Sequence, residues 1–121
     1  MIFSFDHANV NVTDIDKSIA FYRDALGLAP SMRWDAPDGH ITIVYLTDGK
    51  TDFKLELTWL RDFPGAYQLG DNKWHLCLRC DDYEGALARH RDMGCIDDDS
   101  EAAHIYFIKD PDGNRVELLR A

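Results

Sequence analysis

One pattern occurs twice in this chain, as His7-Ala8-Asn9-Val10-Asn11-Val12-Thr13-Asp14 and as His75-Leu76-Cys77-Leu78-Arg79-Cys80-Asp81-Asp82. Each stretch places a histidine at the head of an alternating polar and apolar run, which ends in acidic residues typical of a helix start. Each copy later closes with a glutamate inside an apolar strand, as Leu55-Glu56-Leu57 and as Val116-Glu117-Leu118. The chain is therefore an internal duplication with one histidine and one glutamate per copy.

Hydrophobic periodicity predicts the same order of elements in both copies, namely a strand, a helix and three further strands. In the first copy we expect strands at about 3–12, 30–36, 40–47 and 53–60, and a helix from Thr13-Asp14 to Gly27. In the second copy we expect strands at about 74–80, 95–98, 104–109 and 114–120, and a helix from Asp81 or Asp82 to Gly94. The predicted fold class is α+β, with two tandem βαβββ modules that form curved mixed sheets.

Length and composition favour one domain over residues 1–121. The 121 residues are 45% apolar, which is enough to bury a core without disulfide bridges. Within this domain we expect module one at 1–60, a polar connection at 61–72 and module two at 73–121.

Charge and cysteine content indicate a cytoplasmic protein that binds neither nucleic acid nor membrane. The formal net charge of −9 repels nucleic acid and anionic lipid, so an anionic ligand must be met by local cations. No apolar run is long enough to cross a bilayer, and residues 1–4 (MIFS) lack the features of a signal peptide. Three cysteines, an odd number, argue against a disulfide framework and for a reducing compartment.

Strand alternation places the repeated histidines and glutamates on the polar face of their sheets, opposite the apolar residues that pack under the helices. Taken singly, each has a structural interpretation, as a hydrogen-bonded histidine or a solvent-facing glutamate. Their recurrence at matched positions favours a metal site, because ionisable groups that converge on an inner face are costly to desolvate without a bound cation. The candidate ligands are His7, Glu56, His75 and Glu117.

The other histidines and cysteines receive structural interpretations. His40 follows a turn and is expected to be exposed, His90 occupies a packing position of its helix, and His104 is left open. Cys77 and Cys80 have CxxC spacing, but residues three apart in a strand face opposite sides, so we exclude a shared zinc or redox motif. Cys80 is expected in the core and Cys77 on the side of the neighbouring histidine.

Two segments, residues 13–28 (TDIDKSIAFYRDALGL) and 110–118 (DPDGNRVEL), resemble the glyoxalase I branch of the vicinal oxygen chelate superfamily. Residues 55–59 (LELTW) and 67–70 (YQLG), followed by a histidine, are similar to the region of glyoxalase I that carries its second and third metal ligands. The resemblance covers nearly the whole chain. It implies the vicinal oxygen chelate fold and assigns the four candidate residues to the four glyoxalase ligand positions.

The resemblance implies a lactoylglutathione lyase-like enzyme, which isomerises a methylglyoxal–thiol hemithioacetal to the S-lactoyl thioester through an enediolate and so detoxifies methylglyoxal. Nickel or cobalt is the favoured divalent metal, with zinc as a further candidate, and glutathione or another thiol is the cosubstrate. Glu117 is the expected principal base and Glu56 its counterpart on the other side of the substrate. The resemblance implies a homodimer with its sites at the interface, and the sequence is also compatible with a closed monomer.

Two positions depart from the family. Asn11 and Leu60 replace an arginine and an asparagine that usually contact glutathione, so the identity of the thiol stays open. The remaining cations on the polar face lie on the same side of their strands as a candidate metal ligand. Of these cations, Arg115 is expected to carry most of the anion recognition. The predicted substrate-binding residues are Arg115, Arg79, Lys54, Asn11 and Thr58.

Three alternatives remain at this stage. One is another metal-dependent enzyme of the superfamily, such as an epimerase or a thiol transferase, for which three of the four ligands would suffice. The second is a non-catalytic protein that sequesters an aromatic or drug-like molecule in a metal-free cavity lined by Trp34, Tyr45 and Trp59. The third is a metal-free structural relative.

Overall fold

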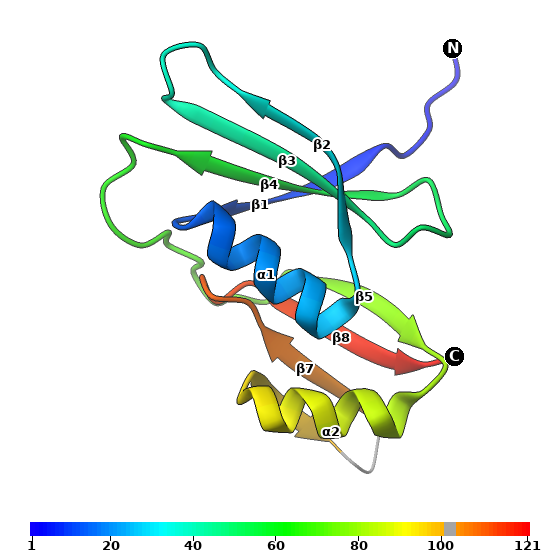
Figure 1. Cartoon of the computed structure of the whole chain (residues 1–121). Coiled ribbons are helices and arrows are strands. Elements are labelled where there is room, and N and C mark those ends of the chain that lie inside the picture. Colours follow the sequence, from blue (N-terminus) through cyan, green and yellow to red (C-terminus); the bar gives the residue numbers. More distant parts are fainter. Residues whose placement is uncertain (101–103) are drawn as a thin grey trace. The chain divides into compact units, whose positions relative to one another are not determined.

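The computed structural model describes residues 1–100 and 104–121 (Figure 1). The chain separates into two compact units, unit 1 from Met1 to Tyr67 and unit 2 from Gln68 to Ala121. The boundary falls inside the stretch 61–72, where the sequence indicates a connection between two modules. Each unit is described by itself.

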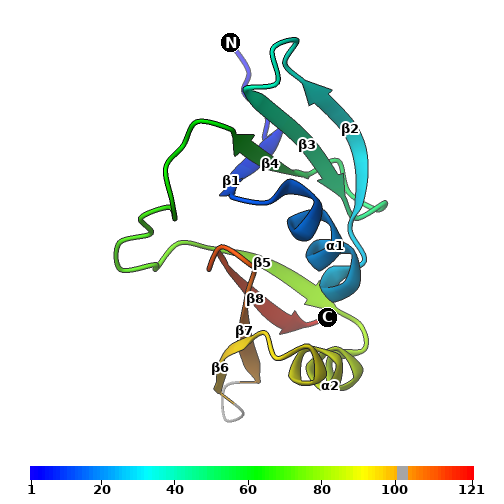
Figure 2. The same cartoon turned by 60° about the vertical axis from the view of Figure 1, so that its left-hand side comes forward.

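Unit 1 is a four-stranded mixed sheet with one helix against one face (Figures 1 and 2). The strands lie in the order β1-β4-β3-β2, with β1 parallel to β4 and the other pairs antiparallel. Its elements are β1 (His7–Val12), α1 (Ile15–Leu26), β2 (Ala29–Asp35), β3 (Ile41–Thr47) and β4 (Lys54–Leu60).

Unit 2 repeats this topology. Its strands lie in the order β5-β8-β7-β6, with β5 parallel to β8 and the remaining pairs antiparallel. Its elements are β5 (His75–Cys80), α2 (Tyr83–Met93), β6 (Ile96–Ser100), β7 (Ile105–Lys109) and β8 (Arg115–Arg120). The predicted α+β class of two βαβββ modules with mixed sheets is thereby confirmed.

Both helices are bounded by the residue types that their sequence indicates. The side chain of Asp14 accepts a hydrogen bond from the Lys17 backbone N–H, and Asp82, rather than Asp81, does the same for the N–H of Gly85. Each helix ends at a glycine in the left-handed conformation, Gly27 or Gly94, which donates its N–H to carbonyls of the last turn. Neither helix in residues 1–100 and 104–121 is long and apolar enough to cross a membrane.

The core of each unit lies between its helix and one face of its sheet. Buried side chains alternate along the strands, so their neighbours are turned to the opposite face, called the polar face below. The helix contributes the buried residues Tyr22 and Ala25 in unit 1, and Tyr83, Leu87 and His90 in unit 2. The buried hydrophobic strand residues are Val10, Val12, Val44, Leu46, Leu55 and Leu57 in unit 1, and Tyr106, Ile108, Val116 and Leu118 in unit 2.

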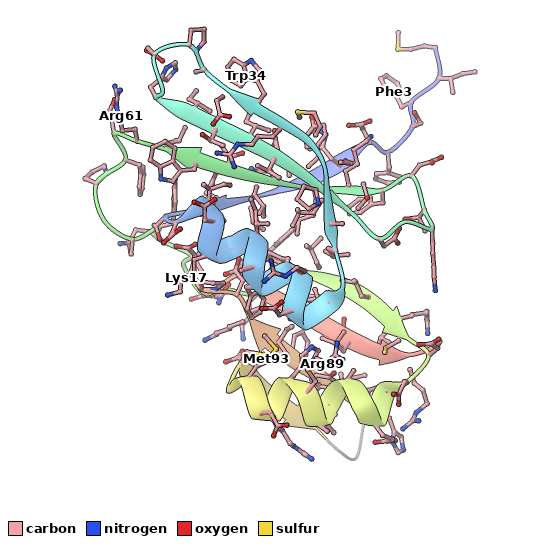
Figure 3. The ribbon with its side chains drawn as sticks, viewed as in Figure 1. Phe3, Lys17, Trp34, Arg61, Arg89 and Met93 are labelled. Carbon is pink, nitrogen blue, oxygen red and sulfur yellow. The ribbon has the colours of Figure 1, made fainter. Side chains whose placement is uncertain are left out.

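The first strand begins four residues later than predicted, at His7 instead of about residue 3. The reason lies in its partner, because β4 begins at Lys54, directly opposite His7, and offers no earlier residue to pair with. The preceding residues extend away from the sheet, as Figure 3 shows for Phe3, and the side chains of Phe3 and Phe5 are exposed. The other strand boundaries lie within two residues of the predicted ones.

Candidate functional site

The first candidate ligand pair lies on the polar face of unit 1. In the parallel register of β1 and β4, Glu56 lies opposite Asn9, so its contact with His7 is diagonal. Nε2 of His7 is 3.6 Å from Oε2 of Glu56, and Nδ1 of His7 is 2.7 Å from Oδ2 of Asp6. The carboxylate of Asp6 therefore fixes the ring on one side, while the other ring nitrogen faces the glutamate.

The second pair lies at the equivalent place in unit 2. In the parallel register of β5 and β8, Glu117 lies opposite Cys77, and its contact with His75 is again diagonal. Nε2 of His75 is 3.0 Å from Oε2 of Glu117, and Nδ1 of His75 is 3.3 Å from the carbonyl oxygen of Lys73. The structure thus brings each predicted histidine together with the predicted glutamate of its own copy.

An aromatic ring accompanies each pair, a common feature that strand alternation alone does not indicate. Tyr45 lies opposite Glu56 on β3, and Phe107 lies opposite Glu117 on β7. The ring centroids of His7 and Tyr45 are 5.2 Å apart, and those of His75 and Phe107 are 5.3 Å apart. A sequence signal exists, because each aromatic residue precedes the aspartate of its hairpin turn by the same number of residues.

Two of the predicted substrate-binding cations are held beside these aromatic rings. Nζ of Lys54 lies 3.0 Å from Oδ1 of Asp6 and 5.9 Å from the centroid of the Tyr45 ring. Nε of Arg115 lies 2.9 Å from Oδ2 of Asp97, and its guanidinium carbon lies 4.0 Å from the centroid of the Phe107 ring. Each cation also pairs with a carboxylate, so only part of its charge is available to an anionic ligand.

The other predicted substrate-binding residues lie further along the same strands. The hydroxyl of Thr58 accepts a hydrogen bond of 2.6 Å from Nδ2 of Asn9. Nη1 of Arg79 donates to the carbonyl oxygen of Arg120 at 3.0 Å, at the far end of β5. Asn11 is exposed on β1, where its register partner is Thr58.

Electrostatics around the two pairs differ between the units. Hydrogen bonds with His7 and Lys54 hold the pKa of the Asp6 carboxyl below its usual value. Partial burial raises the pKa of the Cys77 thiol, and the negative charge of Glu117 adds to this effect. In both pairs the glutamate side chain is the more buried partner, with 15% exposure for Glu56 and 17% for Glu117. These carboxylates are therefore partly desolvated within each unit.

The remaining histidines and Cys80 lie apart from the two pairs. His40 is bonded through Nδ1 to the turn residue Asp38, and His104 is exposed with a positive φ of 54°. His90 is fully buried, and its Nδ1 lies 2.9 Å from the Tyr106 hydroxyl, which confirms its packing role. Cys80 is half-buried, while Cys77 is exposed and beside Glu117, so the two sulfurs face different sides of β5.

Each unit brings together two side chains of the types that bind metal ions. Among residues 1–100 and 104–121, no group of three or more His, Cys, Asp or Glu side chains lies close enough together to hold a metal ion. Each histidine–glutamate pair nevertheless offers one imidazole nitrogen and one carboxylate oxygen, which are ligands that divalent transition metals accept. The donor types of each pair fit a divalent cation.

A cavity of about 230 Å³ lies in unit 1 at the ends of β1 and β4. Its walls include Phe63 and Tyr67, whose rings stack with centroids 4.0 Å apart. Of the three residues expected to line an aromatic sequestering cavity, Trp59 contributes to it. The full lining is Val12, Thr13, Trp59, Leu60, Arg61, Phe63, Gly65 and Tyr67.

Comparison with known proteins agrees with this architecture. The profile of the family described as Glyoxalase/Bleomycin resistance protein/Dioxygenase superfamily matches residues 4–118. A probable lactoylglutathione lyase from Synechocystis is 32% identical over 94% of this chain and 92% of its own length. A lactoylglutathione lyase from Neisseria meningitidis is 31% identical over 94% of this chain and 88% of its own length.

Among solved structures, the trypanothione-dependent glyoxalase I of Leishmania major superposes with a TM-score of 0.85. It shares 29% identity, and the match covers 98% of this chain and 87% of that one. These similarities confirm the resemblance to glyoxalase I that the sequence indicates. They also support the expected glyoxalase I-like enzyme class.

Proposed function

Because this chain belongs to the Glyoxalase/Bleomycin resistance protein/Dioxygenase superfamily, we propose that it is a metal-dependent isomerase of the glyoxalase I type. Its substrate is the hemithioacetal that methylglyoxal forms with a thiol, and its product is the S-lactoyl thioester. The role in the cell is the detoxification of methylglyoxal. Cys77, Cys80 and Cys95 are all free, which fits a reducing compartment, and we place the enzyme in the cytoplasm.

The observation that carries this proposal is the repeated constellation on the two polar faces. Each copy supplies a histidine, a glutamate on the neighbouring parallel strand and an aromatic ring on the next strand. Two equivalent carboxylates suit a reaction in which one proton leaves a carbon atom and another is delivered to its neighbour.

We assign the divalent cation to His7, Glu56, His75 and Glu117. Nickel or cobalt is the favoured metal and zinc is a further candidate, since all three accept imidazole and carboxylate ligands. The two histidine–glutamate pairs come from one chain or from two copies in a homodimer, which would carry two equivalent sites. When bound, the cation stabilises the negative charge that develops on the substrate oxygens as the carbon loses its proton.

The residues of the chain then have distinct tasks. The Glu117 carboxylate accepts the proton from the substrate carbon, and Glu56 serves the neighbouring carbon from the other side. His7 and His75 orient the two carboxylates through contacts of 3.6 and 3.0 Å. Tyr45 and Phe107 cover these contacts with aromatic rings and limit the access of water.

Recognition of the thiol is assigned to the cations and hydroxyls of the polar faces. Arg115 is the principal anion contact, because its guanidinium group is fixed against Phe107 and only 16% of its side chain is exposed. Lys54, Arg79, Thr58 and Asn11 are the further contacts. Glutathione is the first thiol to test, and other peptide thiols follow.

A second candidate keeps the metal and changes the substrate. Lys54 and Arg115 are both paired with carboxylates, and Asn11 and Leu60 stand where the family usually contacts glutathione. These features favour a substrate with less negative charge than a glutathione adduct, as in an epimerase or a thiol transferase of the superfamily. If the purified protein binds no divalent ion, the interpretation as a sequestering protein or a metal-free structural relative is favoured instead.

The test begins with protein purified without chelator, whose metal content is measured directly. Chelator-treated protein is then titrated calorimetrically with nickel, cobalt and zinc, and thioester formation from methylglyoxal and glutathione is followed with each metal. We expect saturable binding of a divalent ion and an isomerase activity that the chelator removes and the metal restores. Binding of a metal without isomerase activity on any thiol adduct would shift the assignment to the second candidate.

A further inference from the structure

The cavity at the ends of β1 and β4 is built from the end of the sheet and the segment that follows it. β4 ends at Leu60, and Figure 3 shows Arg61 at this end of the strand. The Arg61 N–H donates to the carbonyl oxygen of His40 at 3.0 Å, and the Phe63 N–H donates to that of Leu60 at 3.3 Å. These bonds hold the start of the segment against the end of β4 and the residue that precedes β3.

Three aromatic side chains line this cavity. The rings of Phe63 and Tyr67 are stacked, with centroids 4.0 Å apart and planes 11° from parallel. Trp59 is the third, and it lies opposite Val12 in the parallel register of β1 and β4. Phe63 remains 39% exposed. A flat apolar partner that covers this partly exposed aromatic surface would bind favourably, because it removes the surface from water.

The cavity is separate from the histidine–glutamate pair of unit 1. Its lining residues, all within the fully described range 1–67, do not include His7, Glu56 or Tyr45. Trp59 lies three residues beyond Glu56 on β4, so the two side chains leave opposite faces of the strand. Their backbones are about 10 Å apart along the strand. A ligand in the cavity therefore does not need to touch the metal.

The size of the cavity limits its ligand to about one ring system. Its volume is about 230 Å³. An apolar cavity of roughly 150 Å³ binds benzene, whereas sites for drug-sized molecules measure roughly 300–1,000 Å³. A single substituted ring or two fused rings therefore fit, and a whole glutathione adduct does not.

The charge of the cavity favours a neutral ligand. The Arg61 guanidinium donates to both carboxylate oxygens of Asp62, at 3.0 and 3.1 Å, and to the carbonyl oxygen of Asp38, at 3.1 Å. Because this cation is already paired and the chain has a net charge of −9, an anion gains little there. The lining residues Thr13 and Tyr67 carry hydroxyl groups, which can bond one polar atom of a ligand.

We propose that this cavity is a second ligand site, which binds a small neutral aromatic molecule of one or two fused rings against Trp59, Phe63 and Tyr67. The site goes beyond the proposed function, because it requires neither the metal nor the thiol. The ring of the ligand packs against the aromatic walls, and a hydroxyl group of the cavity bonds its polar atom.

The first test uses indole as the probe and isotope-labelled, metal-free protein. The chain has three tryptophans, Trp34, Trp59 and Trp74, and replacing each with phenylalanine assigns its ring N–H signal in the NMR spectrum. Trp59 lines the cavity, whereas the other two are exposed elsewhere. We expect bound indole to shift the Trp59 signal saturably and to leave the other two in place. A Trp59 signal that does not move, or equal shifts of all three, would overturn the proposal.

The second test removes one aromatic wall. Phe63→Leu keeps an apolar side chain but loses the ring, and we expect it to weaken indole binding about three- to tenfold. Phe53→Leu is the matched control, because Phe53 is similarly exposed, at 43% against 39%, and lies outside the cavity. It should bind indole as wild type does. Equal affinities of the two variants would contradict the assignment of the site to these rings.

Two further probes test the ligand class. Cyclohexanol has a polar group but no flat ring, and indole-2-carboxylate has the flat rings together with a negative charge. We expect both to bind more weakly than indole in the same NMR titration. Tighter binding of either probe would show that the assigned class is wrong.

The last test asks whether the cavity is separate from the proposed thiol and metal site. Leu60 is a lining residue that shares a face of β4 with Glu56, so displacement by glutathione is measured directly. We expect glutathione not to displace indole, and His7→Ala to bind indole with wild-type affinity. Displacement, or loss of binding in His7→Ala, would make the cavity part of the proposed site and overturn the proposal. Since the readout needs no isomerase activity, failure of the proposed function would leave this result unchanged.

Discussion

The imidazole of His75 and the carboxylate of Glu117 meet at 3.0 Å across two parallel strands, although Glu117 lies two residues beyond the residue directly opposite His75. The same diagonal step relates His7 and Glu56 in unit 1, at 3.6 Å. The chain between histidine and glutamate is longer in the first copy than in the second, yet the register is preserved. Loop length varies in this repeat without moving the pair, because strand pairing fixes which residues meet.

We expect His7→Ala to weaken binding of the divalent ion by more than about tenfold, since loss even of an indirect partner commonly costs that much. His40→Ala is the matched control, because this histidine is bonded to a turn aspartate and lies outside both pairs. Calorimetric titration of chelator-treated protein measures both affinities. Equal affinities in the two variants would remove His7 from the ligand set.

We expect Glu117→Gln to reduce kcat by ~10²-fold or more, because the amide keeps the size of the side chain but cannot accept the substrate proton. Metal is partly retained, since one oxygen donor remains. Glu56→Gln, the equivalent change in the first copy, should have a smaller effect on kcat. Steady-state assays with the hemithioacetal compare the two variants, and near-normal turnover in Glu117→Gln would refute the base assignment.

We expect Arg115→Ala to raise KM for the hemithioacetal of glutathione, with a smaller effect on kcat, which is the signature of lost uniform binding. The matched control is Arg89→Ala, which removes the same charge from the exposed surface of α2 (Figure 3). Both variants have the same net charge, so a rise in KM confined to Arg115→Ala reports a local contact. An unchanged KM would favour the second candidate function.

Alternation and turn signals were sufficient to predict the order of the ten elements in residues 1–100 and 104–121, and they placed both histidine–glutamate pairs on the polar face. They could not predict where β1 begins, because that depends on the length of its partner β4. They also missed the pairing of Tyr45 with Glu56 and of Phe107 with Glu117, which requires the register of two hairpins. The local sequence determines whether a segment forms a strand and which of its residues share a face. It does not determine which other strands pair with that segment.

The ion pair between Asp97 and Arg115 illustrates the same limit at the level of one side chain. The pairing of β6 with β7 changes register between Ile96 and Asp98, so Asp97 lies at an irregularity of the strand. At such a point alternation no longer tells which face a side chain occupies. The sequence therefore predicted Arg115 as an anion-binding residue without indicating a carboxylate partner, and the structure pairs it with Asp97.

We expect Asp110→Ala to cost about 1–3 kcal/mol of unfolding free energy, because it leaves buried donors of the hairpin turn without an acceptor. Asp110 is buried and accepts from the backbone N–H groups of Asp112 and Asn114 and from the Asn114 side chain. Asp48 closes the equivalent turn of unit 1 with three similar bonds but is exposed, so water replaces it in Asp48→Ala. Denaturant unfolding of the two variants should show the larger loss for Asp110, and equal losses would contradict the role of burial.

We expect the stabilisation by Asp97 to disappear in acid. Burial raises the pKa of this carboxyl, but its interactions with Lys109 and Arg115 outweigh burial and hold the pKa below its usual value. The unfolded chain therefore binds the proton more readily, so the contribution of Asp97 to stability is complete above the unfolded pKa of about 3.9 and is lost as pH falls through the lower folded value.

Wild type should exceed Asp97→Asn in unfolding temperature at neutral pH, and the difference between the two temperatures should close below about pH 4. Asp98→Asn, an exposed neighbour, controls for the change of charge, and a gap between wild type and Asp97→Asn that persists in acid would contradict the ion-pair explanation.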